Sequence, residues 1–238
     1  MTQSYKLDKS IAIMQPTYLP WVGYFAMIDQ VDIFIVLESV QFSKRSWQQR
    51  NQIKTANGPI WLTVPVKSKG KRGQLINEVE VDTSRNYSAA HILSLENNYR
   101  KSPYFSEYSP KLFSLLENGH RYLPGLTIEL IVWFCMVLGI TTPIKYSSKM
   151  ENTGTKADLL AMLCAQLNAT EYVSPLGSRK YLEASDAFDK LNIPIKYYEY
   201  QPIPYPQLFG EFLPYMSIVD LLFNVGPESL SVIRQGYK

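Results

Sequence analysis

The sequence predicts an α/β fold with a Rossmann-like parallel sheet. Two short and almost wholly apolar segments lie at 11–15 and 32–38, a helical segment joins them at 21–30, and strands again alternate with helices in the last third of the chain. Apolar strands joined through a helix are typical of parallel sheets that are covered on both faces. Because no internal repeat or low-complexity tract interrupts the chain, we expect one α/β domain over residues 1–238, with a mainly helical insertion around residues 86–140.

The first expected unit is a β-α-β motif. Its first strand, residues 11–15, is ended by Pro16, and Pro20 closes the loop that follows. A short helix is expected at 21–30. The second strand, at 32–38, is apolar almost throughout.

The middle of the chain departs from this pattern. Residues 39–57 are polar and basic, and we expect a loop there. A strand is expected at 60–66, and the alternation of polar and apolar residues at 76–82 predicts a half-exposed strand. Two helical segments follow, at 86–118 and 124–139.

The last third returns to alternating strands and helices. Strands are expected at 144–147, 171–174 and 195–200. Thr155 and Asp158 have the spacing of a capping box, and Ser217 and Asp220 repeat it. We therefore expect a helix to begin at each of these two positions.

Composition limits the class of function. Cys135 and Cys164 have neither CxxC spacing nor a nearby histidine, so neither a zinc site nor a disulfide framework is expected, and the cytoplasm fits best. Residues 1–10 are polar and show no signal peptide. The apolar run 126–140 carries Glu129 and is shorter than the ~20 residues that a bilayer crossing needs, so we expect a buried helix and no membrane span. The net charge of +3 suits an anionic small molecule and gives no reason to expect nucleic acid.

The common catalytic signatures are missing. The sequence holds no glycine-rich nucleotide-binding motif, no nucleophile elbow and no HExxH zinc motif. The two histidines, His91 and His120, fall in the central helical region, where a solvated or structural role is the usual one. No cofactor and no metal ligand are therefore assigned.

The loop after the first strand is the first candidate site, because ligands of open parallel sheets bind beyond the carboxyl ends of the strands. It carries Gln15, Tyr18, Trp21, Gly23 and Tyr24. The aromatic rings could stack on a base or a sugar, and Gly23 would let a phosphate approach the helix N-terminus. The alternative is a stiff proline turn whose aromatic side chains belong to the core.

The second candidate is the polar segment that follows the second strand, at the same edge of the sheet. It contains Gln41, Lys44, Trp47, Arg50 and Asn51. Its cationic groups could clamp a diphosphate or a carboxylate, and a loop that only faces solvent has little use for a tryptophan. The alternative is an ordinary solvated loop.

Two further segments carry candidate polar side chains. Ser174, Gly177, Ser178 and Arg179 follow a strand and open a helix, where they could cradle an anion. Asp220 and Asn224 lie four residues apart, on one face of a helix. The alternative for this last pair is capping or structural hydrogen bonding.

Several motifs in one order resemble the WbqC-like family. They are the run QPTYLPWVGYF at 15–25, the strand at 32–42, and the segments 47–51, 61–65, 172–177, 181–182 and 217–224. The resemblance extends from about Ile11 to Gly226. That family is associated with the biosynthesis of bacterial O-antigen, part of lipopolysaccharide, and of related surface polysaccharides. The resemblance thus implies a pathway more readily than a reaction.

A weaker resemblance concerns the start of the fold. A strand, a Pro-Thr step and a helix that begins with Gly and an aromatic residue are similar to the start of HIGH-motif nucleotidyltransferases and class I synthetases. The matching run is Trp21-Val22-Gly23-Tyr24, in which the glycine is kept and both histidines are replaced. The loss of that histidine pair weighs against adenylyl transfer.

The leading interpretation is a transferase that moves an acyl or aminoacyl group onto a nucleotide-linked amino sugar. Catalysis would rest on positioning and charge neutralisation. Lys44, Arg50 and Arg179 would bind anions, and Tyr24 or Asp220 would accept the proton. One alternative is a nucleotidyltransferase-like enzyme with an altered HIGH motif. Another is a non-catalytic protein that binds a nucleotide sugar.

Overall fold

The computed structural model describes residues 8–237. Its centre is a five-stranded sheet in the order β5-β2-β1-β6-β7, in which all neighbouring strands are parallel. The strands are β1 (Ser10–Met14), β2 (Ile33–Val36), β5 (Ile144–Tyr146), β6 (Glu171–Pro175) and β7 (Ile195–Tyr198). The predicted α/β class with a parallel, Rossmann-like sheet is confirmed.

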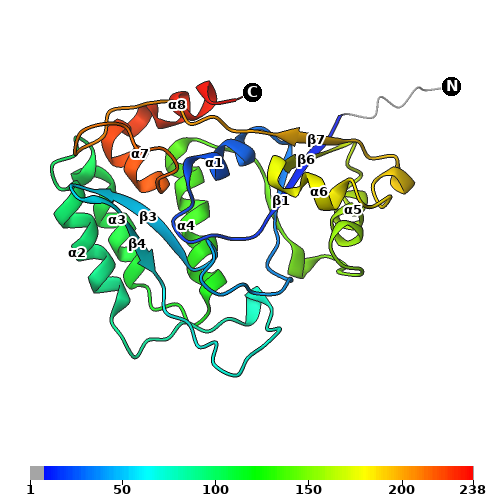
Figure 1. Ribbon diagram of the computed structural model, residues 1–238, viewed down its shortest axis with the longest axis horizontal. Helices are drawn as coiled ribbons and strands as arrows, with labels where there is room; N and C mark the ends of the chain where they lie inside the picture. The colour runs from blue at the N-terminus through cyan, green and yellow to red at the C-terminus, as the bar shows by residue number, and fades with distance from the viewer. Residues whose placement is uncertain (1–7, 238) are drawn as a thin grey trace.

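The helices lie on the two sides of this sheet, α5 and α6 on one side and the others on the other (Figure 1). They are α1 (Val22–Asp29), α2 (Tyr87–Tyr99), α3 (Phe105–Glu117), α4 (Leu123–Leu138), α5 (Ala157–Gln166), α6 (Arg179–Leu182), α7 (Ile218–Val225) and α8 (Ser229–Gln235). The side chains of β1 alternate between two cores. Ala12 packs into the core that includes α1, α4 and α7, whereas Ile11 and Ile13 pack into the core that includes α5.

The order of the strands places a topological switch at the middle of the sheet. From β1 the chain adds β2 and then β5 on one side, and it later returns to add β6 and β7 on the other. Ile11 accordingly pairs with Ile33 of β2 and with Tyr172 of β6. The loops that leave β1 and β6 therefore diverge at the carboxyl edge, where sheets of this type hold their ligands.

The apolar segment near the middle of the chain is a buried helix, as predicted. It is α4, in which Leu126, Leu130 and Phe134 have no exposed surface. Burial on all sides is wrong for one face of this helix, because Val132 and Met136 are 44% and 66% exposed. No helix within residues 8–237 is long and apolar enough to cross a membrane.

The loop predicted for residues 39–57 is wrong in its second half. Arg50–Thr55 form strand β3, which pairs antiparallel with β4 (Gly58–Thr63) in a hairpin outside the main sheet. The buried positions of β3 include the polar side chains of Asn51 and Lys54. Because polar residues occupy the inward positions, the apolar alternation that marks a strand is missing.

Two neighbouring strand predictions also need correction. The strand expected at 60–66 is β4, which ends at Thr63. The strand expected at 76–82 is wrong, because Ile76–Glu78 form a 3-10 turn and Val81 makes only an isolated bridge. The backbone of this segment instead pairs with the approach to α4, where the Val81 amide donates to the carbonyl of Arg121 at 2.9 Å.

One of the two expected capping boxes begins its helix as predicted. Ser217 Oγ accepts a hydrogen bond from the Val219 amide at 3.3 Å, at the start of α7. The other prediction is wrong, since the residue before α5 is Lys156 and no side chain caps that helix. Lys156 has a positive φ of 52°, outside the helical region, so the helix begins only at the next residue.

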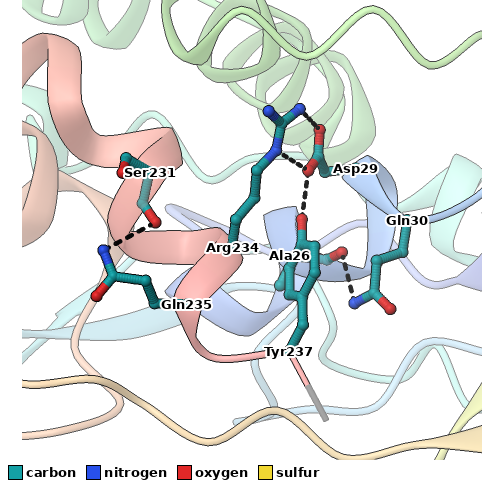
Figure 2. A network of polar contacts seen from close by, with 7 residues as sticks. All are labelled: Ala26, Asp29, Gln30, Ser231, Arg234, Gln235 and Tyr237. Carbon is teal, nitrogen blue, oxygen red and sulfur yellow. Dashed lines mark hydrogen bonds and ion pairs between the residues drawn. The ribbon is translucent and has the colours of Figure 1, made fainter.

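The last helix is fastened to the first by a buried carboxylate. Figure 2 shows Arg234 and Tyr237 converging on Asp29 at the end of α1. The Arg234 guanidinium donates to both Asp29 oxygens, at 2.8 and 3.0 Å, and the Tyr237 hydroxyl donates to the same carboxylate. Burial alone would raise the pKa of Asp29, but these hydrogen bonds and the guanidinium charge together lower it. The clamp holds the C-terminal segment against α1.

Candidate functional site

A cavity of about 510 Å³ lies at the carboxyl ends of β1 and β6, where the topology switches. We call it the switch-point cavity. Its walls come from β1 and the loop after it, the segment after β2, α5, and β6 with α6. It is lined by Ile13, Met14, Gln15, Thr17, Leu37, Ser43, Ser46, Trp47, Gln48, Leu160, Tyr172, Pro175, Ser178 and Tyr181.

The lining has an apolar floor, a polar wall and two exposed aromatic rings. The polar wall consists of Gln15, Thr17, Ser43, Ser46, Gln48 and Ser178, and none of these side chains carries a charge. Trp47 and Tyr181 are 48% and 41% exposed, and they approach the cavity from the segment after β2 and from α6, respectively. Within the described part of the chain, this cavity has no ionised side chain in its lining.

Hydrogen bonds dock the segment that carries Trp47 onto the loop after β1. The Tyr18 amide donates to the carbonyl of Trp47 at 3.0 Å. The buried Gln48 side chain donates to Gln15 Oε1 at 2.7 Å and accepts from the Ser43 amide at 2.9 Å. Two loops that are far apart in sequence thus form a single wall of the cavity.

Trp47 packs against Trp61, which in turn packs against the Arg50 guanidinium. The rings of Trp47 and Trp61 have centroids 5.2 Å apart, and the Arg50 guanidinium lies 4.2 Å above the Trp61 ring. Trp61 belongs to β4, so the hairpin outside the main sheet holds the ring that faces the cavity. Cation–π and aromatic contacts of this kind restrain an otherwise exposed side chain.

The predicted anion-binding residues lie outside the cavity lining. Lys44 is exposed on the segment after β2, and Arg50 stacks on Trp61. Arg179 forms an ion pair with Glu183 one helical turn away, at 2.7 Å. A single-turn ion pair on an exposed helix is an ordinary surface interaction. The cations that the sequence indicated are therefore not brought together.

Two of the predicted aromatic residues are core residues. Tyr18 and Tyr24 have no exposed surface. The Tyr18 hydroxyl contacts His91 Nδ1 at 2.8 Å, and the Tyr24 hydroxyl donates to the carbonyl of Gln15 at 3.2 Å. Burial raises the pKa of both phenols well above its usual range. Neither side chain lines the cavity, so the core alternative describes these two positions.

The run that resembles the HIGH motif is covered by one of its own side chains. The Trp21 ring packs against Tyr200 and Tyr215, with centroids 5.7 and 5.5 Å away. It also lies over Gly23, where an added Cβ would come within 2.2 Å of it. Gly23 thus makes room for an indole ring, and neither residue lines the cavity.

We expect Gly23→Ala to destabilise the protein by about 1–3 kcal/mol, because the Trp21 ring must leave its packed position. Helix propensity alone predicts the opposite sign, a gain of roughly 1 kcal/mol. Gly177→Ala is the matched control, because a Cβ there meets nothing within 4 Å. Urea unfolding of both variants decides the sign. A Gly23→Ala protein as stable as the control would mean that the ring moves freely.

Three other predicted polar residues make structural hydrogen bonds. The buried Asn51 donates to the carbonyl of Leu19 at 2.6 Å, which ties β3 to the loop after β1. Asn224 donates to the Asp220 carbonyl at 2.8 Å and accepts from Ser102 at 3.1 Å. Asp220 has no exposed surface and accepts from two tyrosines.

The remaining predicted residues divide between the cavity and other places. Gln15 and Trp47 line the switch-point cavity, and Gln41 lines a neighbouring hollow. Ser174 is fully buried below the cavity rim. Gly177 and Arg179 border a separate hollow on the outer side of α6.

Ser178, from the expected anion cradle, does line the cavity, whereas sequence reasoning missed several other lining residues: Thr17, Ser43, Ser46, Gln48 and Tyr181. Most of them are small or uncharged and lie between the residues that were singled out. Their signal was position, since each follows the carboxyl end of a strand. Uncharged hydroxyls and amides are common in any loop, so residue type alone does not mark them.

Comparison with known proteins finds similarity along most of the chain. The profile of the WbqC-like protein family matches residues 15–232. An uncharacterized protein of Mycobacterium tuberculosis is 41% identical over 228 residues, which cover 95% of this chain and 98% of that protein. No solved structure matches the chain. Because the family profile spans nearly all of the residues from β1 to α8, the chain belongs to the WbqC-like protein family.

Proposed function

We propose that this protein is a transferase of bacterial surface-polysaccharide (O-antigen) assembly that binds a nucleotide-activated sugar in the switch-point cavity. The observation that carries the proposal is a cavity at the topological switch of a parallel sheet, walled by two exposed aromatic rings and uncharged hydrogen-bonding groups. The pathway comes from the association of the WbqC-like family with O-antigen.

The lining suits an uncharged ring with many polar substituents. Trp47 and Tyr181 offer faces for stacking, which is worth about 1–3 kcal/mol for a nucleic acid base. Thr17 Oγ1 is buried and has no hydrogen-bond partner among residues 8–237. A ligand hydroxyl or amide would satisfy it, and leaving such a group unpaired is costly.

The transfer step would rest on positioning. The lining contains hydroxyls of serine, threonine and tyrosine, and no histidine or carboxylate among the described residues. The amino nitrogen of the sugar would attack the acyl carbon of an activated donor such as acyl-coenzyme A, the carbon–sulfur bond would break, and coenzyme A would leave as the thiol with the proton that the nitrogen loses. Close placement of the two reacting groups alone contributes several kcal/mol. The buried positions of Tyr24 and Asp220 give the proposal no proton acceptor from these two residues.

Two alternative functions, a nucleotidyltransferase-like enzyme and a non-catalytic binding protein, are distinguished by the binding experiment described below. A nucleotidyltransferase-like reaction would need the run Trp21–Tyr24 at the ligand, and that run lies away from the cavity lining. A non-catalytic nucleotide-sugar protein would bind without forming product.

The proposal is tested by calorimetric titration with UDP-N-acetylglucosamine, dTDP-glucose, GDP-mannose and CMP-N-acetylneuraminate. We expect at least one to bind, and Trp47→Ala and Tyr181→Ala each to weaken it by roughly 5-fold to 150-fold. Tyr122→Ala is the control, since Tyr122 is similarly exposed, at 38%, and lies outside the cavity. Equal affinity in all three variants would remove the ligand from this cavity. Mass spectrometry after adding acyl-coenzyme A together with UDP-glucosamine, whose free amino group can accept the acyl group, then separates a transferase from a binding protein.

A further inference from the structure

A second hollow adjoins the switch-point cavity. It has a volume of about 530 Å³ and is lined by Gln15, Leu37, Val40, Gln41, Lys156, Leu159, Leu160 and Tyr181. Gln15, Leu37, Leu160 and Tyr181 line both hollows, so the two meet along a shared wall. We call this second hollow the Lys156 lobe.

The two parts of this crevice differ in charge. Among the described residues, Lys156 is the one ionised side chain that lines either part. It is exposed, and it forms no ion pair within residues 8–237. The lobe has two further polar lining residues, Gln15, which it shares with the switch-point cavity, and Gln41, which it does not share. The rest of the lobe is lined mainly by the aliphatic side chains Leu37, Val40, Leu159 and Leu160, so the Lys156 ammonium is the group there that can attract an anion.

From this arrangement we infer that the Lys156 lobe binds the phosphate or diphosphate of the ligand whose uncharged ring occupies the switch-point cavity. The inference deepens the proposed function and rests on it for the identity of the ring. A nucleotide sugar is a molecule of this shape, with uncharged rings on either side of a diphosphate. Tyr181 and Gln15, which line both parts, would lie at the junction of ring and phosphate.

The cations that the sequence indicated lie elsewhere, and Lys156 was not among them. Arg50 holds Trp61, and Arg179 is paired with Glu183. Lys156 directly precedes α5 and lies far from Trp47 in the sequence, so no local pattern links the two residues. The sheet order brings α5 beside the carboxyl end of β1.

The first test uses pairs of probes that differ only in their phosphates: uridine and UDP, thymidine and dTDP, guanosine and GDP, cytidine and CMP. For a nucleoside that binds, we expect the wild-type protein to prefer its phosphorylated form. We expect Lys156→Met to weaken the phosphorylated form by roughly 10-fold to 100-fold and to leave the nucleoside unchanged. Lys156→Arg should restore most of the preference, and Lys111→Met, on the outer surface of α3, should retain all of it.

The second test does not depend on any nucleotide. In protein whose lysines carry 13C-methyl groups, titration with inorganic pyrophosphate should shift the NMR signal of Lys156 more than that of Lys111. Equal shifts, or an unchanged preference for phosphate in Lys156→Met, would overturn the inference even where nucleotide sugars bind. Selective shifts of Lys156 without binding of any nucleotide sugar would support the anion site and contradict the proposed function.

Discussion

Replacing Asp220 with alanine is expected to destabilise the protein by roughly 2–5 kcal/mol. The carboxylate has no exposed surface, and it accepts hydrogen bonds from Tyr99 at 2.7 Å and from Tyr205 at 3.0 Å. Burial raises the pKa of this carboxyl, and the two tyrosine hydrogen bonds only partly oppose that rise. Without the carboxylate, two buried hydroxyls lose their acceptor.

The effect should spread beyond α7, because Asp220 belongs to a larger polar cluster. Gln207 donates to the Tyr205 hydroxyl at 3.2 Å, and the buried Lys54 ammonium donates to Gln207 at 3.1 Å. The cluster thereby fastens the irregular segment between β7 and α7 onto the hairpin strand β3.

Urea unfolding measures this prediction, with the exposed Asp189→Ala as the control. Asp220→Asn keeps the size of the side chain and one carbonyl acceptor, so it should cost less than Asp220→Ala. Wild-type stability in Asp220→Ala would contradict the prediction. Loss of turnover in Asp220→Asn with wild-type stability would restore the proton-acceptor role that the sequence indicated.

Acidification from about pH 6.5 to about pH 4 should cost the protein roughly 3 kcal/mol of stability through His91 alone. Burial lowers the pKa of His91 to about 4, against a weaker opposing effect of its hydrogen bond to the Thr63 backbone. In the unfolded chain His91 therefore binds a proton below about pH 6.5, whereas in the folded protein it binds one only near pH 4. The stabilising contribution is complete above this range and is lost as the pH falls through it, at about 1.4 kcal/mol per pH unit.

The comparison that isolates His91 is the pH dependence of unfolding in His91→Gln. A glutamine can still accept the hydrogen bond that the Tyr18 hydroxyl makes to Nδ1, but it does not titrate. The variant should show a flatter profile than the wild type between pH 6.5 and pH 4. Parallel profiles would mean that His91 becomes protonated at the same pH in the folded protein as in the unfolded chain.

The elements that could be predicted are those whose signal is local. β1 and β2 are continuous apolar runs and α4 is a long apolar run, so the burial of both strands and of most of α4 follows from residue type alone, whereas the exposed face at Val132 and Met136 does not. β3 could not be predicted in this way, because its buried positions hold Asn51 and Lys54. These side chains are buried only because distant partners, the carbonyl of Leu19 and the side chain of Gln207, accept their hydrogen bonds.

A small part of the candidate site followed from the same local logic. Gln15 lies directly after β1 and Trp47 in the segment that follows β2, at the edge where an open sheet binds ligands, and both line the cavity. Gly23 shows the limit of such reasoning. A glycine at a helix start suggests an approaching phosphate, whereas the object that approaches is the ring of Trp21 two residues earlier.

By itself, the sequence determined the α/β class, the buried central helix, the family and the edge of the sheet at which to look for a ligand. The tertiary structure alone decided which side chains meet there. The order β5-β2-β1-β6-β7 places Tyr181 and Ser178 across from Trp47, and it brings Lys156 to the adjoining lobe, while Arg50 and Arg179 are held by Trp61 and Glu183. Strand propensity and apolar periodicity act over a few neighbouring residues, whereas the direction of a polar side chain is set by partners that only the completed packing brings within hydrogen-bonding distance.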